Sequence, residues 1–143
     1  LGTSMGAAAI MKACHDYHLP AKSIIIECPF GSMRQSVINR FNQMKLPSFP
    51  MADLLVFWGG AINGFNAFSL NPSEYAQTID VPTFLIAGKK DNKVIRTEIN
   101  EIYKNLKGRK KLVIFPHAKH ANYLEADNEM WKEYIKDWLE KQQ

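Results

Sequence analysis

Three short runs of mostly apolar, β-branched residues, separated by longer segments with helical patterns, set the strongest limit on the fold of this chain. They cover residues 23–28, 81–87 and 111–115. Their apolar residues are consecutive and do not alternate with polar ones, which is typical of parallel strands buried on both faces. Strands that alternate with helices indicate an α/β fold, in which a parallel sheet is flanked by helices and joined by right-handed crossovers.

Helical patterns occupy the segments around these runs. Residues 5–17 are mostly helix formers, and Pro20 ends this segment. The spacing of apolar residues predicts further helices at about 31–45, 94–106 and 128–140. We expect the last helix to turn five apolar residues towards the core: Trp131, Tyr134, Ile135, Trp138 and Leu139.

Residues 29–80 differ from this alternating pattern, and we interpret them as a helical lid inserted into one domain that covers residues 1–143. Prolines and glycines interrupt the segment, which also carries many aromatic residues. Two explanations fit the aromatic side chains, because they either line a pocket for an apolar group or pack in the core. These residues are Phe30, Phe41, Phe49, Phe57, Trp58, Phe65, Phe68 and Tyr75.

Composition excludes several classes of protein. With 46% apolar residues the chain can bury a core, and its net charge of +4 is common among enzymes. The two cysteines form neither a disulfide framework nor a zinc-type spacing, and no run approaches the ~18 apolar residues of a membrane span. We therefore expect a cytoplasmic protein without nucleic-acid or membrane partners, and with neither a cofactor nor a metal ion.

The segment Gly2-Thr3-Ser4-Met5-Gly6 fits the pattern G-x-S-x-G, in which a serine lies on a sharp turn between a strand and a helix. A larger side chain two residues before or after the serine is expected to strike the neighbouring backbone, which explains the two glycines. The predicted helix over 5–17 provides the required context. A glycine-rich helix start is the structural alternative.

Candidate acids follow two of the predicted strands. Asp91 lies in the loop Gly88-Lys89-Lys90-Asp91-Asn92-Lys93-Val94, where a carboxylate can orient an imidazole. A turn or a helix cap also explains an aspartate here. Glu27 ends the first run and is the alternative acid, because chemistry in parallel sheets collects at the carboxyl ends of strands.

His120 follows the last predicted strand and is the candidate base. His117 is its competitor, but it lies so close to the strand that an imidazole at this position is harder to present over the sheet edge. The two histidines as metal ligands are a further alternative, although neither a cysteine nor an H-E-x-x-H motif accompanies them.

The order serine, aspartate, histidine, each after a strand, resembles the α/β-hydrolase family from Gly2 to the C-terminus. The lid sequence from Cys28 to Ser32, the G-x-x-D-x-x-V loop and the ending from His120 to Leu124 resemble esterase-like and serine-aminopeptidase-like members. This resemblance implies the C-terminal half of an α/β-hydrolase fold. It also implies a serine hydrolase, with Ser4 as nucleophile, His120 as base and Asp91 as acid.

The resemblance further implies that the backbone N–H of Met5 is one donor of the oxyanion hole. The second donor belongs to an earlier strand that this sequence does not contain, so we expect a truncated fragment with little activity. An exposed sheet edge in such a fragment also favours self-association.

The predicted substrates are small carboxylic esters, amides, thioesters or peptides, which sequence alone does not rank. The alternative function is a non-catalytic binding or scaffold module with the same fold.

Overall fold

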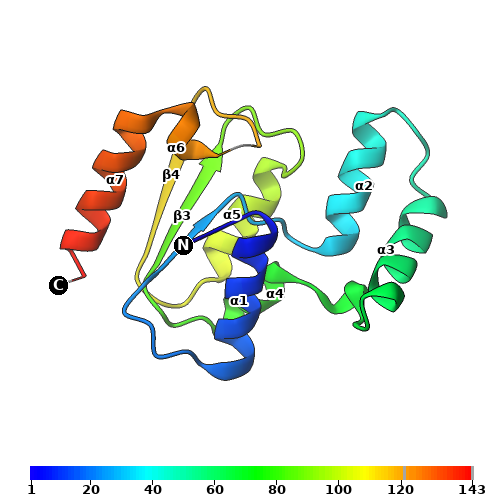
Figure 1. Cartoon of the computed structure of the whole chain (residues 1–143), viewed down its shortest axis with the longest axis horizontal. Helices are drawn as coiled ribbons and strands as arrows, with labels where there is room; N and C mark the ends of the chain where they lie inside the picture. The colour runs from blue at the N-terminus through cyan, green and yellow to red at the C-terminus, as the bar shows by residue number, and fades with distance from the viewer. Residues whose placement is uncertain (121, 143) are drawn as a thin grey trace.

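The computed structural model describes residues 1–120 and 122–142 and contains a four-stranded parallel sheet with helices on both faces (Figure 1). The strands are β1 (Gly2–Thr3), β2 (Ile24–Glu27), β3 (Thr83–Gly88) and β4 (Lys110–Phe115). They lie side by side in the order β1-β2-β3-β4, each parallel to the next. The predicted α/β class is confirmed. β1 precedes Ser4, as the G-x-S-x-G pattern requires, although its two residues are too few to show an apolar run in the sequence.

Helices connect and follow these strands. They are α1 (Met5–Tyr17), α2 (Met33–Gln43), α3 (Met51–Ile62), α4 (Pro72–Tyr75), α5 (Arg96–Asn105), α6 (Tyr123–Ala126) and α7 (Asn128–Glu140), with 3-10 turns η1 (Ala67–Ser69) and η2 (Ala76–Thr78). The predicted helices correspond to α1, α2, α5 and α7 within about two residues. The four-residue helix α6 was not predicted, because so short a helix shows no periodicity.

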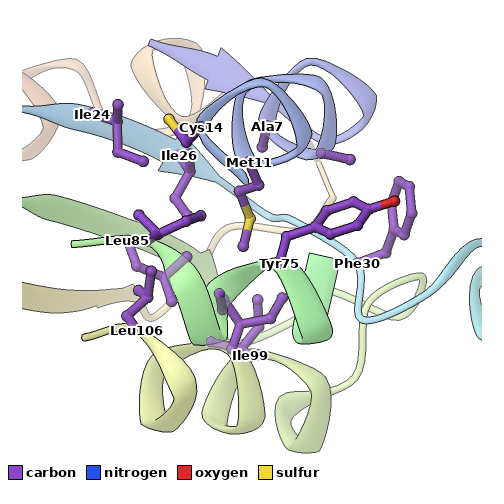
Figure 2. Packing of buried hydrophobic residues seen from close by; sticks show 14 of the residues in the cluster. Ala7, Met11, Cys14, Ile24, Ile26, Phe30, Tyr75, Leu85, Ile99 and Leu106 are labelled. Atoms are coloured by element: carbon purple, nitrogen blue, oxygen red, sulfur yellow. The ribbon is translucent and has the colours of Figure 1, made fainter. Parts of the chain in front are cut away.

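On one face of the sheet, α1, α4 and α5 cover alternate side chains of β2 and β3 (Figure 1). The small residues Ala7 and Ala8 let α1 approach the sheet closely, and Met11 is fully buried. Figure 2 shows Met11 pointing towards Tyr75, with Ile26 and Leu85 of the sheet beside them. This packing fixes α1, and therefore the turn before it, against the strands.

On the other face, α6 and α7 cover the remaining strand side chains. Phe84 stacks on Trp138 with ring centroids 5.5 Å apart, and Phe115 meets Tyr123 edge-on at 5.3 Å. The inward orientation predicted for α7 is wrong for Leu139, whose side chain is 47% exposed. Trp138 already covers Phe84 on this face, so the end of α7 leaves its next residue in solvent.

Residues 29–80 form two structurally different parts. α2 and α3 pack on each other and stand away from the sheet (Figure 1). In contrast, α4 and η2 pack against α1 and α5, and their residues Tyr75, Ala76 and Ile79 belong to the core. The function of the segment as a lid stays a prediction.

The aromatic residues of this segment divide in the same way. Phe30 and Tyr75 are core residues, as packing alone would predict. Five others are exposed by between 43% and 78%, so core packing does not account for them: Phe49, Phe57, Trp58, Phe65 and Phe68.

Within the described residues, no helix is long and apolar enough to span a bilayer.

The two glycines around Ser4 differ in their surroundings. A Cβ atom on Gly2 would lie 2.7 Å from the backbone carbon of Gly6, closer than packed atoms approach. A Cβ atom on Gly6 would meet nothing within 4 Å among the described residues. The steric explanation therefore holds for Gly2, but it is wrong for Gly6, because the side-chain direction of Gly6 points into open space.

We expect Gly2→Ala to lower the free energy of unfolding by about 1–3 kcal/mol, because an overpacked Cβ has to displace the start of α1. Gly6→Ala is the matched control and should raise it by about 0.5–1 kcal/mol, since alanine favours the helix. Urea unfolding of both variants measures the difference. Equal losses in the two variants would contradict the packing described here.

Candidate functional site

Ser4 occupies the turn between β1 and α1 in a backbone conformation that non-glycine residues rarely adopt, with φ 51° and ψ −111°. Two hydrogen bonds hold the turn. The N–H of Ser4 donates to the carbonyl oxygen of Glu27 at 2.8 Å, and the N–H of Ala8 donates to the carbonyl oxygen of Ser4 at 3.0 Å. Such strain persists only where the surrounding structure enforces it. The turn points the hydroxyl of Ser4 beyond the carboxyl end of β1.

The side chains of Ser4, His120 and Asp91 form a continuous hydrogen-bonded chain. Ser4 Oγ lies 3.0 Å from His120 Nε2, and His120 Nδ1 lies 2.8 Å from Asp91 Oδ2. The residues are 116 and 29 positions apart in sequence. The structure thus brings the three predicted residues together in the predicted order of contact.

Backbone groups of its own loop orient the carboxylate of Asp91. Its Oδ1 atom accepts hydrogen bonds from the N–H groups of Lys93 at 2.8 Å and Val94 at 3.0 Å, which leaves Oδ2 for His120. The N–H of Lys90 donates to the carbonyl oxygen of Ala118 at 3.0 Å and ties this loop to the loop of His120. A Cβ atom on Gly88 would lie 2.5 Å from that same oxygen, so only glycine permits this approach.

Glu98 connects the acid loop to α2, and sequence analysis missed it. Its carboxylate is buried and accepts hydrogen bonds from the backbone N–H groups of Gly31 at 2.9 Å and Ile95 at 3.1 Å. It also accepts one from the side-chain amide of Asn39 at 2.8 Å, and that amide donates in addition to the carbonyl oxygen of Lys93. A buried carboxylate with several donors is costly to remove. A glutamate at the third position of a helix was the available signal.

Hydrogen bonding shifts the pKa values of the acid and the imidazole apart. The hydrogen bond that His120 donates to Asp91, followed by that with Cys28, raises the pKa of His120 from 6.5 to about 9. Burial tends to raise the pKa of Asp91, but the hydrogen bonds from His120, Val94 and Lys93 outweigh it and hold this pKa below 3.8. Asp91 is therefore a carboxylate at neutral pH, facing an imidazole that readily holds a proton.

The alternative candidates lie elsewhere. The buried carboxylate of Glu27 accepts hydrogen bonds from Thr3 Oγ1 at 2.8 Å and from Trp131 Nε1 at 2.6 Å, and it does not hydrogen-bond His120. His117 is exposed after β4 and has no hydrogen bond to the site within the described residues.

Met5, the predicted oxyanion donor, is the first residue of α1. Its backbone N–H is one of those at a helix start that lack an intrahelical acceptor.

Cys28 is a second residue of the site that sequence analysis missed. It follows β2 with φ 39°, is fully buried, and its sulfur lies within 4.8 Å of ligand atoms of both Asp91 and His120. Its position directly after a strand was the available signal in the sequence. Three such ligand types can hold a metal ion. A metal at this point would have to replace the His120–Asp91 hydrogen bond, because both ring nitrogens of His120 are engaged.

A protein-family comparison decides the classification. The model of the family described as PhoPQ-activated pathogenicity-related protein matches residues 66–143, which is more than half of the chain. The chain belongs to this family. Among curated proteins, this member of the PhoPQ-activated pathogenicity-related family is similar to the uncharacterized protein YqkD of Bacillus subtilis, with 24% identity over 141 residues. The match covers 97% of the chain and 46% of YqkD.

Solved structures show that this family member has the α/β-hydrolase fold. An esterase of Pyrococcus furiosus matches with a TM-score of 0.72 and 22% identity, over 98% of the chain and 52% of the esterase. The hydrolase MGS-MChE2 from a sediment metagenome of the Mar Chica lagoon matches with a TM-score of 0.69 and 16% identity, over 98% of the chain and 59% of its own. The chain thus spans about half the length of these hydrolases.

The raised pKa of His120 is directly measurable. In an NMR titration, we expect the His120 imidazole to titrate near pH 9, while Asp91→Asn lowers its pKa towards 6.5, because the amide no longer stabilises the imidazolium. A normal His120 pKa in the unsubstituted protein would contradict the hydrogen-bonded pair.

Proposed function

We propose that this protein is a serine hydrolase that cleaves carboxylic esters through an acyl-enzyme on Ser4. The observation that carries the proposal is the hydrogen-bonded chain from Ser4 through His120 to Asp91. The strained turn at Ser4 supports it, because backbone strain of this kind collects at reactive positions. The fold neighbours are hydrolases as well.

In the proposed mechanism, His120 carries its proton on Nδ1, facing Asp91, so that Nε2 accepts the proton of Ser4 Oγ as this oxygen attacks the ester carbonyl. His120 then gives that proton to the leaving alcohol. A water molecule deprotonated by His120 hydrolyses the acyl-enzyme and regenerates Ser4. Asp91 holds the imidazole in the required tautomer and stabilises its protonated form.

The oxyanion of the tetrahedral intermediate needs donors that are already in position. We assign the backbone N–H of Met5 this role, because it follows the nucleophile and lies at the positive end of the helix α1. A donor of this kind contributes on the order of 10²–10³ in rate.

Esters are the favoured substrates over amides and peptides. A cavity of about 380 Å³ begins at Met5 and is lined mainly by apolar side chains of α2 and α3, which suits a hydrocarbon acyl group. The esterase of Pyrococcus furiosus shares the fold, which is consistent with this choice. Parallel assays with an ester, an amide and a thioester of the same acyl group rank the three.

A fluorophosphonate probe tests the proposal, since it reacts only with an activated serine. We expect labelling on the peptide that contains Ser4, and none in Ser4→Ala. Absence of labelling in the unsubstituted protein would favour the non-catalytic alternative.

The two acids are separated by a matched pair of variants. We expect Asp91→Asn to slow ester hydrolysis by about 10⁴, because the imidazole loses its orienting carboxylate. Glu27→Gln should retain most of the turnover, since Glu27 bonds to Thr3 and Trp131. p-Nitrophenyl butyrate hydrolysis measures both. The reverse ranking would exchange the roles of the two carboxylates.

The pH dependence follows from the same imidazole. His120 acts as a base only when it is neutral, so kcat/KM should rise with pH up to about 9, the pKa of His120. A rate that is already maximal at pH 7 would show that the free enzyme does not hold this proton.

A further inference from the structure

The carboxyl edge of the sheet carries a group of exposed cations that we name the basic rim. Its members come from three segments around the hydrogen-bonded chain: the end of α2 and the loop after it, the loop and helix start around Asp91, and the loop before His120. They are Arg40, Lys45, Lys89, Lys90, Lys93, Arg96 and Lys119, and each is exposed.

Hydrogen bonds keep these segments together. The side chains of Asn39 and Gln43 on α2 donate to the carbonyl oxygens of Lys93 and Asn92. The N–H of Lys90 donates to the carbonyl oxygen of Ala118, one residue before Lys119. The three segments that carry the cations are therefore tied to one another.

Few acidic side chains accompany the basic rim. Exposed ones follow His120 on α6 and at the start of α7: Glu125, Asp127 and Glu129. Residues 28–52 and 102–124 contain no Asp or Glu, and residues 81–97 contain only Asp91, which is bonded to His120. Within the described residues, no rim cation forms an ion pair with a carboxylate, whereas Arg34 and Lys111 elsewhere do. The chain has a net charge of only +4, so seven exposed cations near these three acids leave an excess of positive charge around the carboxyl edge of the sheet.

The surface formed by residues 54–73, next to the basic rim, is uncharged and largely apolar. The cavity that begins at Met5 continues between Met33 and Val37 of α2, Leu55 and Val56 of α3, and Phe65. An apolar group attached to the reacting carbonyl has this cavity beside it, while Lys89, Lys90 and Lys119 of the basic rim lie on the loops around Asp91 and His120.

We infer that the substrate is an anionic amphiphile: an ester whose acyl part is a hydrocarbon chain and whose alcohol part carries a negative charge such as a phosphate. This inference rests on the proposed function. Because His120 protonates the leaving alcohol, that alcohol has to lie next to His120 and hence beside the two loops that carry Lys89, Lys90 and Lys119. The acyl chain then extends into the cavity at Met5.

Binding to the Ser4→Ala protein tests the inference without turnover, so the result is independent of whether Ser4 is a nucleophile. The ligands are 1-decanoylglycerol 3-phosphate and 1-decanoylglycerol, which differ only in the phosphate, and glycerol 3-phosphate, which lacks the acyl chain. Calorimetric titration below the micelle concentration should give about tenfold tighter binding of the acylated phosphate than of either other ligand, with the difference shrinking as salt is added.

A charge-matched pair of variants locates the effect. Replacing Lys89, Lys90 and Lys93 by Gln should remove the preference for the phosphate and leave the affinity for 1-decanoylglycerol unchanged. Replacing Lys22, Lys104 and Lys107 by Gln lowers the net charge equally but away from the rim, because these residues lie before β2, at the end of α5 and before β4, and should preserve the preference. Leu55→Gln should weaken both acylated ligands alike, because Leu55 lines the cavity.

Equal affinity for 1-decanoylglycerol and its phosphate would overturn the inference, as would an equal loss in the two lysine triples. If glycerol 3-phosphate binds as tightly as 1-decanoylglycerol 3-phosphate, the inference that the cavity binds the acyl chain is wrong. If the preference is found but fluorophosphonate labelling fails, the proposed hydrolysis is wrong and the binding site stands. If hydrolysis is found without the preference, only the amphiphile inference fails.

Discussion

The parallel register of the sheet is the constraint on which the rest of the structure depends. Thr3 pairs with Glu27, and Glu27 pairs with Ile86, so neighbouring strands end at similar levels. Every loop that follows a strand therefore begins at the same edge. Ser4, Cys28, Asp91 and His120 all follow strand ends, and this common edge is what allows residues up to 116 positions apart to form one hydrogen-bonded chain.

Two kinds of interaction hold that chain in position. The nonpolar packing of α1 on one face and of α6 and α7 on the other fixes the strands and the turn at Ser4. Polar contacts then orient the loops: backbone N–H groups bind Asp91, and Glu98 with Asn39 connects the acid loop to α2. Glu98 thus contacts both α2, through Asn39, and the backbone of Ile95, which follows the acid loop.

Charge and polarity are distributed unevenly around the hydrogen-bonded chain. The buried carboxylate of Asp91 raises the pKa of His120, and the rim outside them is cationic. On the other side, α2 and α3 offer an apolar cavity and several exposed aromatic side chains. A hydrogen-bonded chain that lies between a cationic surface and an apolar one suits a substrate with the same division. This is the physical basis for linking the proposed hydrolysis to amphiphilic esters.

Sequence alone determined the α/β class, four of the helices, and the order of Ser4, Asp91 and His120. Periodicity and strand-end positions can be recognised from residues that are neighbours in the chain. The catalytic roles of these three residues stay predictions. Sequence alone did not determine that Glu27 bonds to Thr3 and Trp131, or that Cys28 and Glu98 belong to the site. It also did not determine that the side-chain direction of Gly6 points into open space. These features arise from contacts between residues that lie far apart in the chain, and only the packing of the sheet and its helices brings those residues together.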